Sequence, residues 1–152
     1  LWAIATVIML LASVLLAGSF QRNPALPDPR AAAHAALAPH GVFHVTRHPM
    51  MWSIALWAAT HILLSPTPRQ IILAGAIGLL ALLGAHLQDR KKESQMGDAW
   101  TGWEERTSYW PRFGGLARAG AIAWIGGFII WLAATYAHIH ANGIPAGLWR
   151  WL

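Results

Sequence analysis

The chain has 152 residues, of which 56% are hydrophobic and only 11% are charged, and its mean hydropathy is +0.42. Roughly a quarter of an ordinary soluble domain is charged, so this composition excludes a water-soluble globular protein. The lack of cysteine excludes a disulfide scaffold and a thiolate metal site. A net charge of +5 would suggest nucleic acid binding in a soluble protein, but membrane orientation explains it here, and no nucleic acid partner is expected.

Four apolar runs without Asp, Glu, Lys or Arg divide the chain. They cover residues 1–19, 49–65, 71–88 and 119–136, and each is about long enough to cross a hydrocarbon core as a helix. The sequence therefore predicts an all-α fold. It would be a polytopic membrane helix bundle with about four transmembrane helices, one domain over residues 1–152, solvated by the lipid bilayer. Because the chain opens inside an apolar run, we expect upstream residues to be missing.

The basic residues are divided very unevenly between the two sides of this bundle. Nine of the eleven Lys and Arg residues fall in segments 20–48 and 89–118, whereas only Arg69 and Arg150 fall on the other side. Positive charge concentrates on the cytoplasmic side of membrane proteins. The two basic segments are therefore predicted to be cytoplasmic, and both ends of the chain to face outward.

The second cytoplasmic segment carries a helical pattern. Apolar and aromatic side chains recur there at three- and four-residue steps, at Met96, Trp100, Trp103, Thr107 and Trp110. This spacing predicts a cytoplasmic amphipathic helix at the headgroup level, with its indole rings as membrane anchors. Two other interpretations stay open, namely a lid over a site and a docking surface for a membrane partner protein.

The eight histidines form two layers in this topology. His48 and His86 lie at the cytoplasmic boundary, whereas His61 lies near the outer end of the second apolar run. His48 and His61 are thirteen residues apart, about 20 Å along a helix, so they cannot serve one metal ion together. An unbonded imidazole at membrane depth is costly, which makes His61 and His86 functional candidates. The alternative is a purely structural role, in which these imidazoles form hydrogen bonds between helices.

The acidic residues all fall in the predicted cytoplasmic segments, so the membrane interior holds no carboxylate relay. On the cytoplasmic face, a polar pocket for an anionic group is a candidate site. Its residues would be Arg47, His48, Asp89, Arg90 and segment 107–111. The alternative for each arginine is ordinary contact with lipid headgroups.

Four motifs follow one another along the chain: TRHPMMWSIALWAATHIL, QDRKK, MGDAW and ERTSYWP. Their order and spacing closely resemble the NnrU family of bacterial inner-membrane proteins, from about the first apolar run to about Phe113. This resemblance implies a multi-pass protein of the inner membrane with a link to denitrification, that is, to nitrite and nitric oxide metabolism.

The first motif is also similar to zeta-carotene isomerase, a membrane enzyme that binds haem b through histidines. The W-x-x-x-H element of that enzyme matches Trp57 to His61. This resemblance implies an isomerase-like protein in which His61 is an axial metal ligand of haem b and Trp57 lies beside the cofactor.

A more distant likeness is to the isoprenylcysteine carboxyl methyltransferases, which share the RHP tripeptide at residues 47–49. Their cytoplasmic motifs hold S-adenosylmethionine, so the likeness implies a membrane methyltransferase as an alternative. Arg47 and His48 would then help to hold the cofactor beside Asp89 and Arg90, although Asp89 and Arg90 replace the usual paired glutamates. A non-catalytic assembly or regulatory subunit is the third alternative, and whether the chain is an enzyme stays open.

Overall fold

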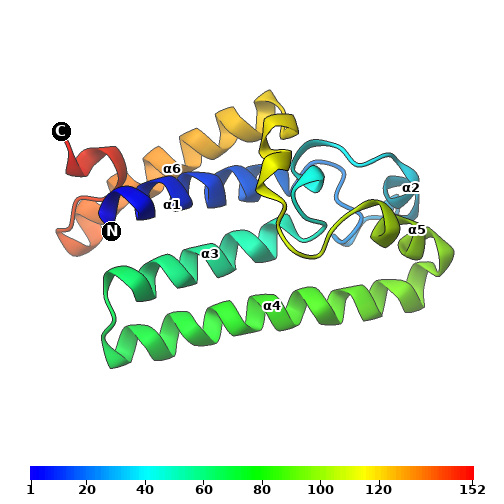
Figure 1. Cartoon of the computed structure of the whole chain (residues 1–152), viewed down its shortest axis with the longest axis horizontal. Coiled ribbons are helices and arrows are strands. Elements are labelled where there is room, and N and C mark those ends of the chain that lie inside the picture. Colours follow the sequence, from blue (N-terminus) through cyan, green and yellow to red (C-terminus); the bar gives the residue numbers. More distant parts are fainter.

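The computed structural model describes residues 1–152 and contains helices but no strands, which confirms the all-α prediction. Four long helices run along the longest axis of the molecule (Figure 1). They are α1 (Trp2–Gly18), α3 (Pro49–Leu64), α4 (Pro68–Met96) and α6 (Ala121–Asn142). Shorter elements are α2 (Ala31–Ala36), α5 (Asp98–Arg106) and the 3-10 helices η1 (Gly41–His44), η2 (Phe113–Arg118) and η3 (Gly147–Arg150). Helix α1 packs against α6 and α3, and α3 packs against α4.

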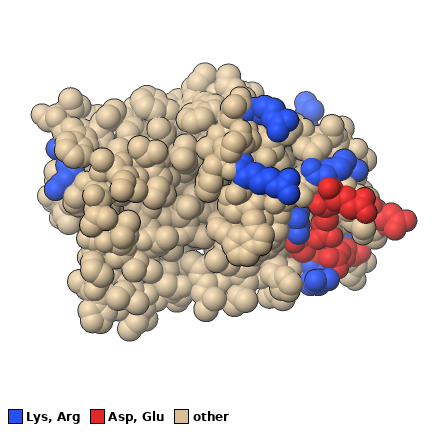
Figure 2. All heavy atoms as spheres, in the orientation of Figure 1, with Lys and Arg blue, Asp and Glu red and all other residues tan.

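Most of the charged side chains, and all of the acidic ones in view, gather at one end of the molecule, formed by α2, α5 and the last turns of α4 (Figure 2). We call this the charged end. Both termini and the turn between α3 and α4 lie at the opposite end. The uneven charge distribution seen in the sequence is therefore also a spatial separation.

Helices α4 and α6 are long and apolar enough to cross a membrane. Only 17% and 22% of their apolar stretches are buried, so they are not the core helices of a soluble protein. Helices α1 and α3 are also apolar but shorter, with 17 and 16 residues. The structure thus contains two candidate membrane spans flanked by two shorter apolar helices.

Helix α4 continues well beyond the end of its apolar run. The sequence predicted a transmembrane segment over 71–88, followed by a loop, but the helix ends only at Met96. Residues 89–96 are mostly good helix formers, and Gly97 then stops the helix with a positive φ of 52°. The apolar run marks only part of the helix, so the polar residues after Gln88 are held on a rigid element instead of a loop.

Close backbone contact between α1 and α6 depends on a glycine. A Cβ atom added to Gly127 would lie 2.5 Å from the Cα atom of Val14, which leaves no room for a side chain. Val14 also belongs to the buried cluster between these helices, together with Leu15, Val42 and Ala123. Small residues at such crossings let helices pack without a gap.

The indole rings of α5 point inward, which corrects their predicted role as membrane anchors. Trp100 and Trp103 are both fully buried and pack with Phe43. Trp110, the last residue of the predicted pattern, lies beyond the end of α5 and is 68% exposed. The predicted helical repeat was therefore too long, and its first two tryptophans form a second core at the charged end.

Candidate functional site

Two neighbouring residues just before α3 bind the carboxylate of Asp89 on α4. Arg47 Nε donates to both Asp89 oxygens at 3.1 Å, and its Nη2 donates to Oδ2 at 2.7 Å. His48 Nε2 donates to Oδ1, also at 2.7 Å. Asp89 and His48 are only 4% and 2% exposed, so the bonds lie in a buried network where bidentate charged pairs have well-defined geometry.

The charge state of Asp89 follows from these contacts. Asp89 comes directly after the charge-free run, in the polar C-terminal part of α4. Burial alone would raise its pKa, but the hydrogen bonds from His48 and Arg47 outweigh burial and hold the pKa below the ordinary value of 3.8. Asp89 is therefore an anion at neutral pH.

The segment after α5 fixes the position of the residues before α3. The Arg47 amide donates to the Ser108 carbonyl at 2.8 Å, and Thr46 Oγ1 donates to the Tyr109 carbonyl at 2.7 Å. The indole of Trp52 donates to the same Tyr109 carbonyl at 2.8 Å. All three bonds are accepted by backbone carbonyls of the SYWP motif. This motif therefore fixes the position of the RHP motif next to it.

Tyr109 links this clamp to α4. Its hydroxyl donates to the Leu82 carbonyl at 3.0 Å, and its ring centre lies 5.6 Å from the Arg47 guanidinium carbon. Burial, and next the negative charge of Asp89, raise the pKa of the Tyr109 hydroxyl above its ordinary value of 10.0. Tyr109 is therefore a neutral hydrogen-bond donor beside the buried ion pair.

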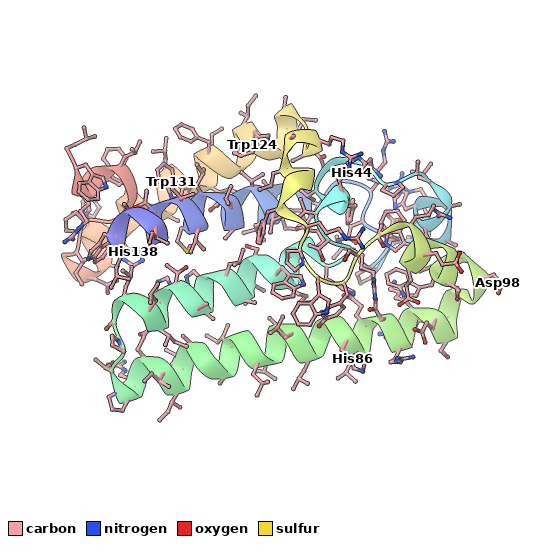
Figure 3. The ribbon with its side chains drawn as sticks, in the orientation of Figure 1. His44, His86, Asp98, Trp124, Trp131 and His138 are labelled. Carbon is pink, nitrogen blue, oxygen red and sulfur yellow. The ribbon has the colours of Figure 1, made fainter.

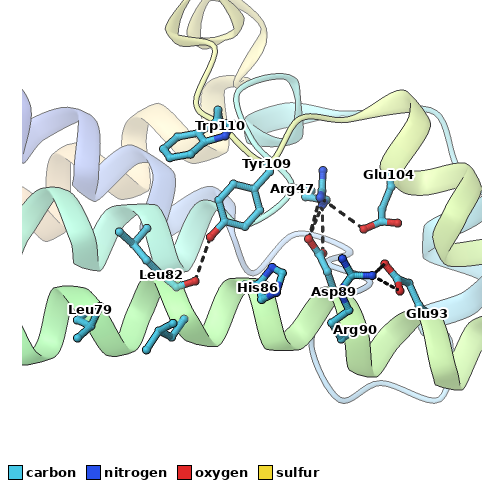
Figure 4. A pocket seen from close by; sticks show the side chains of 11 residues that line it. Arg47, Leu79, Leu82, His86, Asp89, Arg90, Glu93, Glu104, Tyr109 and Trp110 are labelled. Atoms are coloured by element: carbon cyan, nitrogen blue, oxygen red, sulfur yellow. Dashed lines mark hydrogen bonds and ion pairs between the residues drawn. The ribbon is translucent and has the colours of Figure 1, made fainter.

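A cavity of about 460 Å³ lies between α4 and the segment that carries Tyr109 and Trp110 (Figure 4). Part of its lining is apolar, with Leu79, Leu82 and Leu83 from α4. The rest is aromatic or polar. These residues are Arg47, His86, Asp89, Arg90, Glu93, Glu104, Tyr109 and Trp110. The volume is within the range of small-molecule sites in proteins.

Carboxylates outnumber guanidinium groups around this cavity. Arg47 is shared between Asp89 and Glu104, the latter at 3.4 Å, and Arg90 pairs with Glu93 at 3.1 Å. Burial, and next repulsion from Asp89, raise the pKa of Glu104 above its ordinary value of 4.5. Glu104 is thus the least neutralised acid of the site.

Four of the seven site residues predicted from the sequence line this cavity, and a fifth, His48, binds the lining residue Asp89. Arg47 and His48 meet Asp89, and His86 and Arg90 lie on the same stretch of α4. Sequence reasoning did not select Glu104. Its only signal was a place one helical turn from the predicted pocket segment 107–111, on the α5 face next to Trp100 and Trp103.

The other two predicted residues, Trp57 and His61, lie on α3 away from this cavity. His61 Nδ1 donates to the Trp57 carbonyl at 2.8 Å, and the two rings are 4.2 Å apart between centroids. The ring centroids of His138 on α6 and His61 are 5.9 Å apart. His138 lies at the end of the molecule opposite the charged end (Figure 3). His48 and His61 occupy different ends of α3, as the thirteen-residue spacing predicted.

Part of this arrangement suits haem ligation. The bond to the Trp57 carbonyl places the proton on Nδ1 and leaves the Nε2 lone pair of His61 available, as an axial ligand requires. His61 lines neither the cavity beside Asp89 nor a smaller one beside Asp28, and no group of three metal-ligating side chains is present. The residues therefore fit a single axial ligand and do not form a closed metal cage.

Comparisons with known proteins point to one family. A family model described as NnrU protein matches residues 1–146, nearly the whole chain. No curated protein and no solved structure matches the chain.

Proposed function

Since the chain belongs to the NnrU family, we propose that it is a multi-pass protein of the bacterial inner membrane that acts in nitrite and nitric oxide metabolism. Its four long helices would cross the bilayer with the charged end in the cytoplasm, following the positive-inside rule. The link to denitrification rests on the resemblance of the four sequence motifs to that family. The two exposed apolar spans support the membrane location.

The cavity beside Asp89 is the functional centre in this proposal. One observation carries it: residues from three separate parts of the chain, Arg47, Asp89 and Glu104, meet at one cavity through partly buried charged contacts. Such networks are expensive unless fully paired, and perturbed carboxylates in a cavity are typical of functional sites. The cavity would bind a small molecule at the cytoplasmic surface of the membrane.

Genetic complementation tests this function. A denitrifying bacterium that lacks its NnrU-family gene would receive either the wild-type chain or the Asp89→Asn variant, and nitrite and nitric oxide would be measured during anaerobic growth on nitrate. We expect wild-type levels to return only with the wild-type chain. The matched control is Asp28→Asn, because Asp28 pairs with exposed Arg30 far from the cavity lining. Full complementation by Asp89→Asn at equal membrane abundance would contradict the proposal.

The lack of cysteine allows a clean test of topology. Single cysteines would replace Asp98 at the charged end and Arg69 in the first turn of α4 at the opposite end, both exposed. In intact spheroplasts, a membrane-impermeant maleimide should label Arg69→Cys and spare Asp98→Cys until the membrane is permeabilised. The reverse labelling would overturn the proposed orientation, and labelling of both would overturn the multi-pass topology.

Haem binding at the opposite end is a second candidate function. The observation that favours it is the Trp57 carbonyl, which orients His61 with Nε2 free. If bound, haem would supply redox or ligand-binding chemistry, and His61 would hold its iron. The test is the optical spectrum of the protein purified from haem-replete cells. A Soret band lost in His61→Ala but kept in His86→Ala would support this function, and no band in the wild type would contradict it.

A further inference from the structure

We propose that the cavity beside Asp89 binds the organic ammonium head of an amphiphile that enters from the bilayer. This inference rests on the proposed function for the position of the charged end at the membrane surface. It adds a chemical class of ligand that is argued from the lining of the cavity. Three features of the lining carry it: the charge balance, the aromatic wall and the apolar floor.

The charge balance favours a cation over an anion. Both guanidinium groups of the lining are already paired, Arg47 with Asp89 and Arg90 with Glu93. An anionic ligand would have to displace a carboxylate from one of them. Glu104, by contrast, has its ion-pair contact to Arg47 at 3.4 Å, much longer than the 2.7 Å contact that Asp89 makes. Its carboxylate therefore has capacity for a second positive partner.

The aromatic wall provides a second means of holding a cation. Tyr109 and Trp110 both line the cavity, with ring centroids 5.6 Å apart and planes tilted by 72°. The Tyr109 ring already lies beside the Arg47 guanidinium, whereas Trp110 is 68% exposed. The faces of tryptophan and tyrosine rings attract quaternary ammonium groups. The Glu104 carboxylate is the expected charged contact of the head, and the two aromatic rings line the same cavity.

The apolar floor accounts for the rest of the ligand. Leu79 and Leu83 line the cavity and are also 60% and 48% exposed on the outer surface of α4, a candidate membrane span. The lining is thus continuous with the surface that would face lipid. An alkyl chain attached to the ammonium head would lie along these leucines without leaving the hydrocarbon region.

Three probes with the same eight-carbon chain and different head groups test which head-group charge the cavity prefers. The full chain would be placed in discs of digalactosyldiacylglycerol, a neutral lipid without an amine. Binding of octyltrimethylammonium, octyl sulfate and octyl glucoside would be measured by calorimetry below their micelle concentrations, with empty discs as the blank. We expect the ammonium probe to bind at least about tenfold more tightly than the other two. Equal or tighter binding of octyl sulfate would overturn the proposal.

Two further arms locate the site and identify the source of the ligand. Glu104→Gln should weaken octyltrimethylammonium binding by about tenfold, while Glu105→Gln, which alters an exposed neighbouring acid outside the lining, should leave it unchanged. Equal affinities of the two variants would place the ammonium elsewhere and overturn the assignment.

Tetramethylammonium, which has no alkyl chain, should bind at least about tenfold more weakly than octyltrimethylammonium. If it binds equally, a water-soluble amine is the ligand and the amphiphile is excluded.

The outcome is separable from that of the proposed function. Unfolding midpoints of both glutamine variants would show that they fold, since a neutral isostere at either position leaves the cores at Trp103 and Val14 intact. If complementation fails but the ammonium probe binds through Glu104, the denitrification role is wrong and the ligand class stands. If complementation succeeds and the probe does not bind, only the ligand class is wrong.

Discussion

Histidines lie at both ends of this helix bundle, but their neighbours differ. At the charged end, His48 is buried and binds a carboxylate that also holds Arg47. At the opposite end, His61 bonds a backbone carbonyl of its own helix and faces another imidazole, His138. An imidazole with a charged partner belongs to a network that spans several segments, whereas one bonded to its own helix stabilises little beyond that turn. The residue type alone therefore does not say what a histidine does here.

The largest expected effect comes from removing the centre of the charged network. Asp89→Ala leaves Arg47 buried without its main partner and His48 without an acceptor. Breaking a buried pair in this way costs about 3–5 kcal/mol. The measurement is unfolding by sodium dodecyl sulfate in mixed micelles. Asp28→Ala, which removes an exposed ion pair, should leave the midpoint unchanged. If Asp89→Ala and Asp28→Ala shifted the unfolding midpoint equally, the charged network would not contribute specially to stability.

A somewhat smaller loss is expected when the core beneath α5 is emptied. Trp103 is fully buried against Phe43, so Trp103→Ala should cost about 3 kcal/mol in the same unfolding assay. Trp110 is largely exposed, and Trp110→Ala should cost less than about 1 kcal/mol. If Trp103→Ala were as mild as Trp110→Ala, α5 would lie on the membrane as the sequence pattern predicted, and the charged end would have no core of its own.

The two acids of the site should respond to pH with opposite signs. The lowered pKa of Asp89 means that its stabilising charge is fully present above about pH 3.8 and is lost as the pH falls through the folded value. The raised pKa of Glu104 means that its charge costs stability above its folded pKa, and that this cost disappears below about pH 4.5.

Unfolding midpoints from pH 3 to pH 8 check these signs. Glu104→Gln should be at least as stable as the wild type at neutral pH, and the difference should vanish in acid. Ser94→Ala serves as the control, because Ser94 is exposed on α4 and carries no titratable group, so its stability difference should stay constant over the acid range. A Glu104→Gln variant that loses stability at neutral pH would show that this glutamate is fully neutralised by Arg47.

Apolar runs and ordered motifs were enough to predict the helical bundle, its separation of charge, and the meeting of Arg47, His48 and Asp89. They were not enough for α5, because a three- and four-residue repeat of tryptophans looks the same whether the rings face lipid or a protein core. Glu104 was missed for a related reason: its role depends on its contact with Arg47, which is 57 residues away in the sequence and cannot be inferred from local spacing. The expectations of an anionic ligand and of S-adenosylmethionine stay predictions, although the paired arginines favour a cationic ligand over an anionic one.

The smallest effect is expected at the opposite end. His61→Ala removes one bond within a helix and the contact with the Trp57 ring, and this should cost less than about 1.5 kcal/mol in the unfolding assay. His138→Ala, which removes only the facing imidazole, should cost less still. The double variant tests whether the imidazoles act together, since independent residues give additive losses. A loss of stability as large as that of Asp89→Ala, or a strong coupling between the two histidines, would show that this end also contains an interacting network of side chains. The contrast between the two ends would then no longer hold.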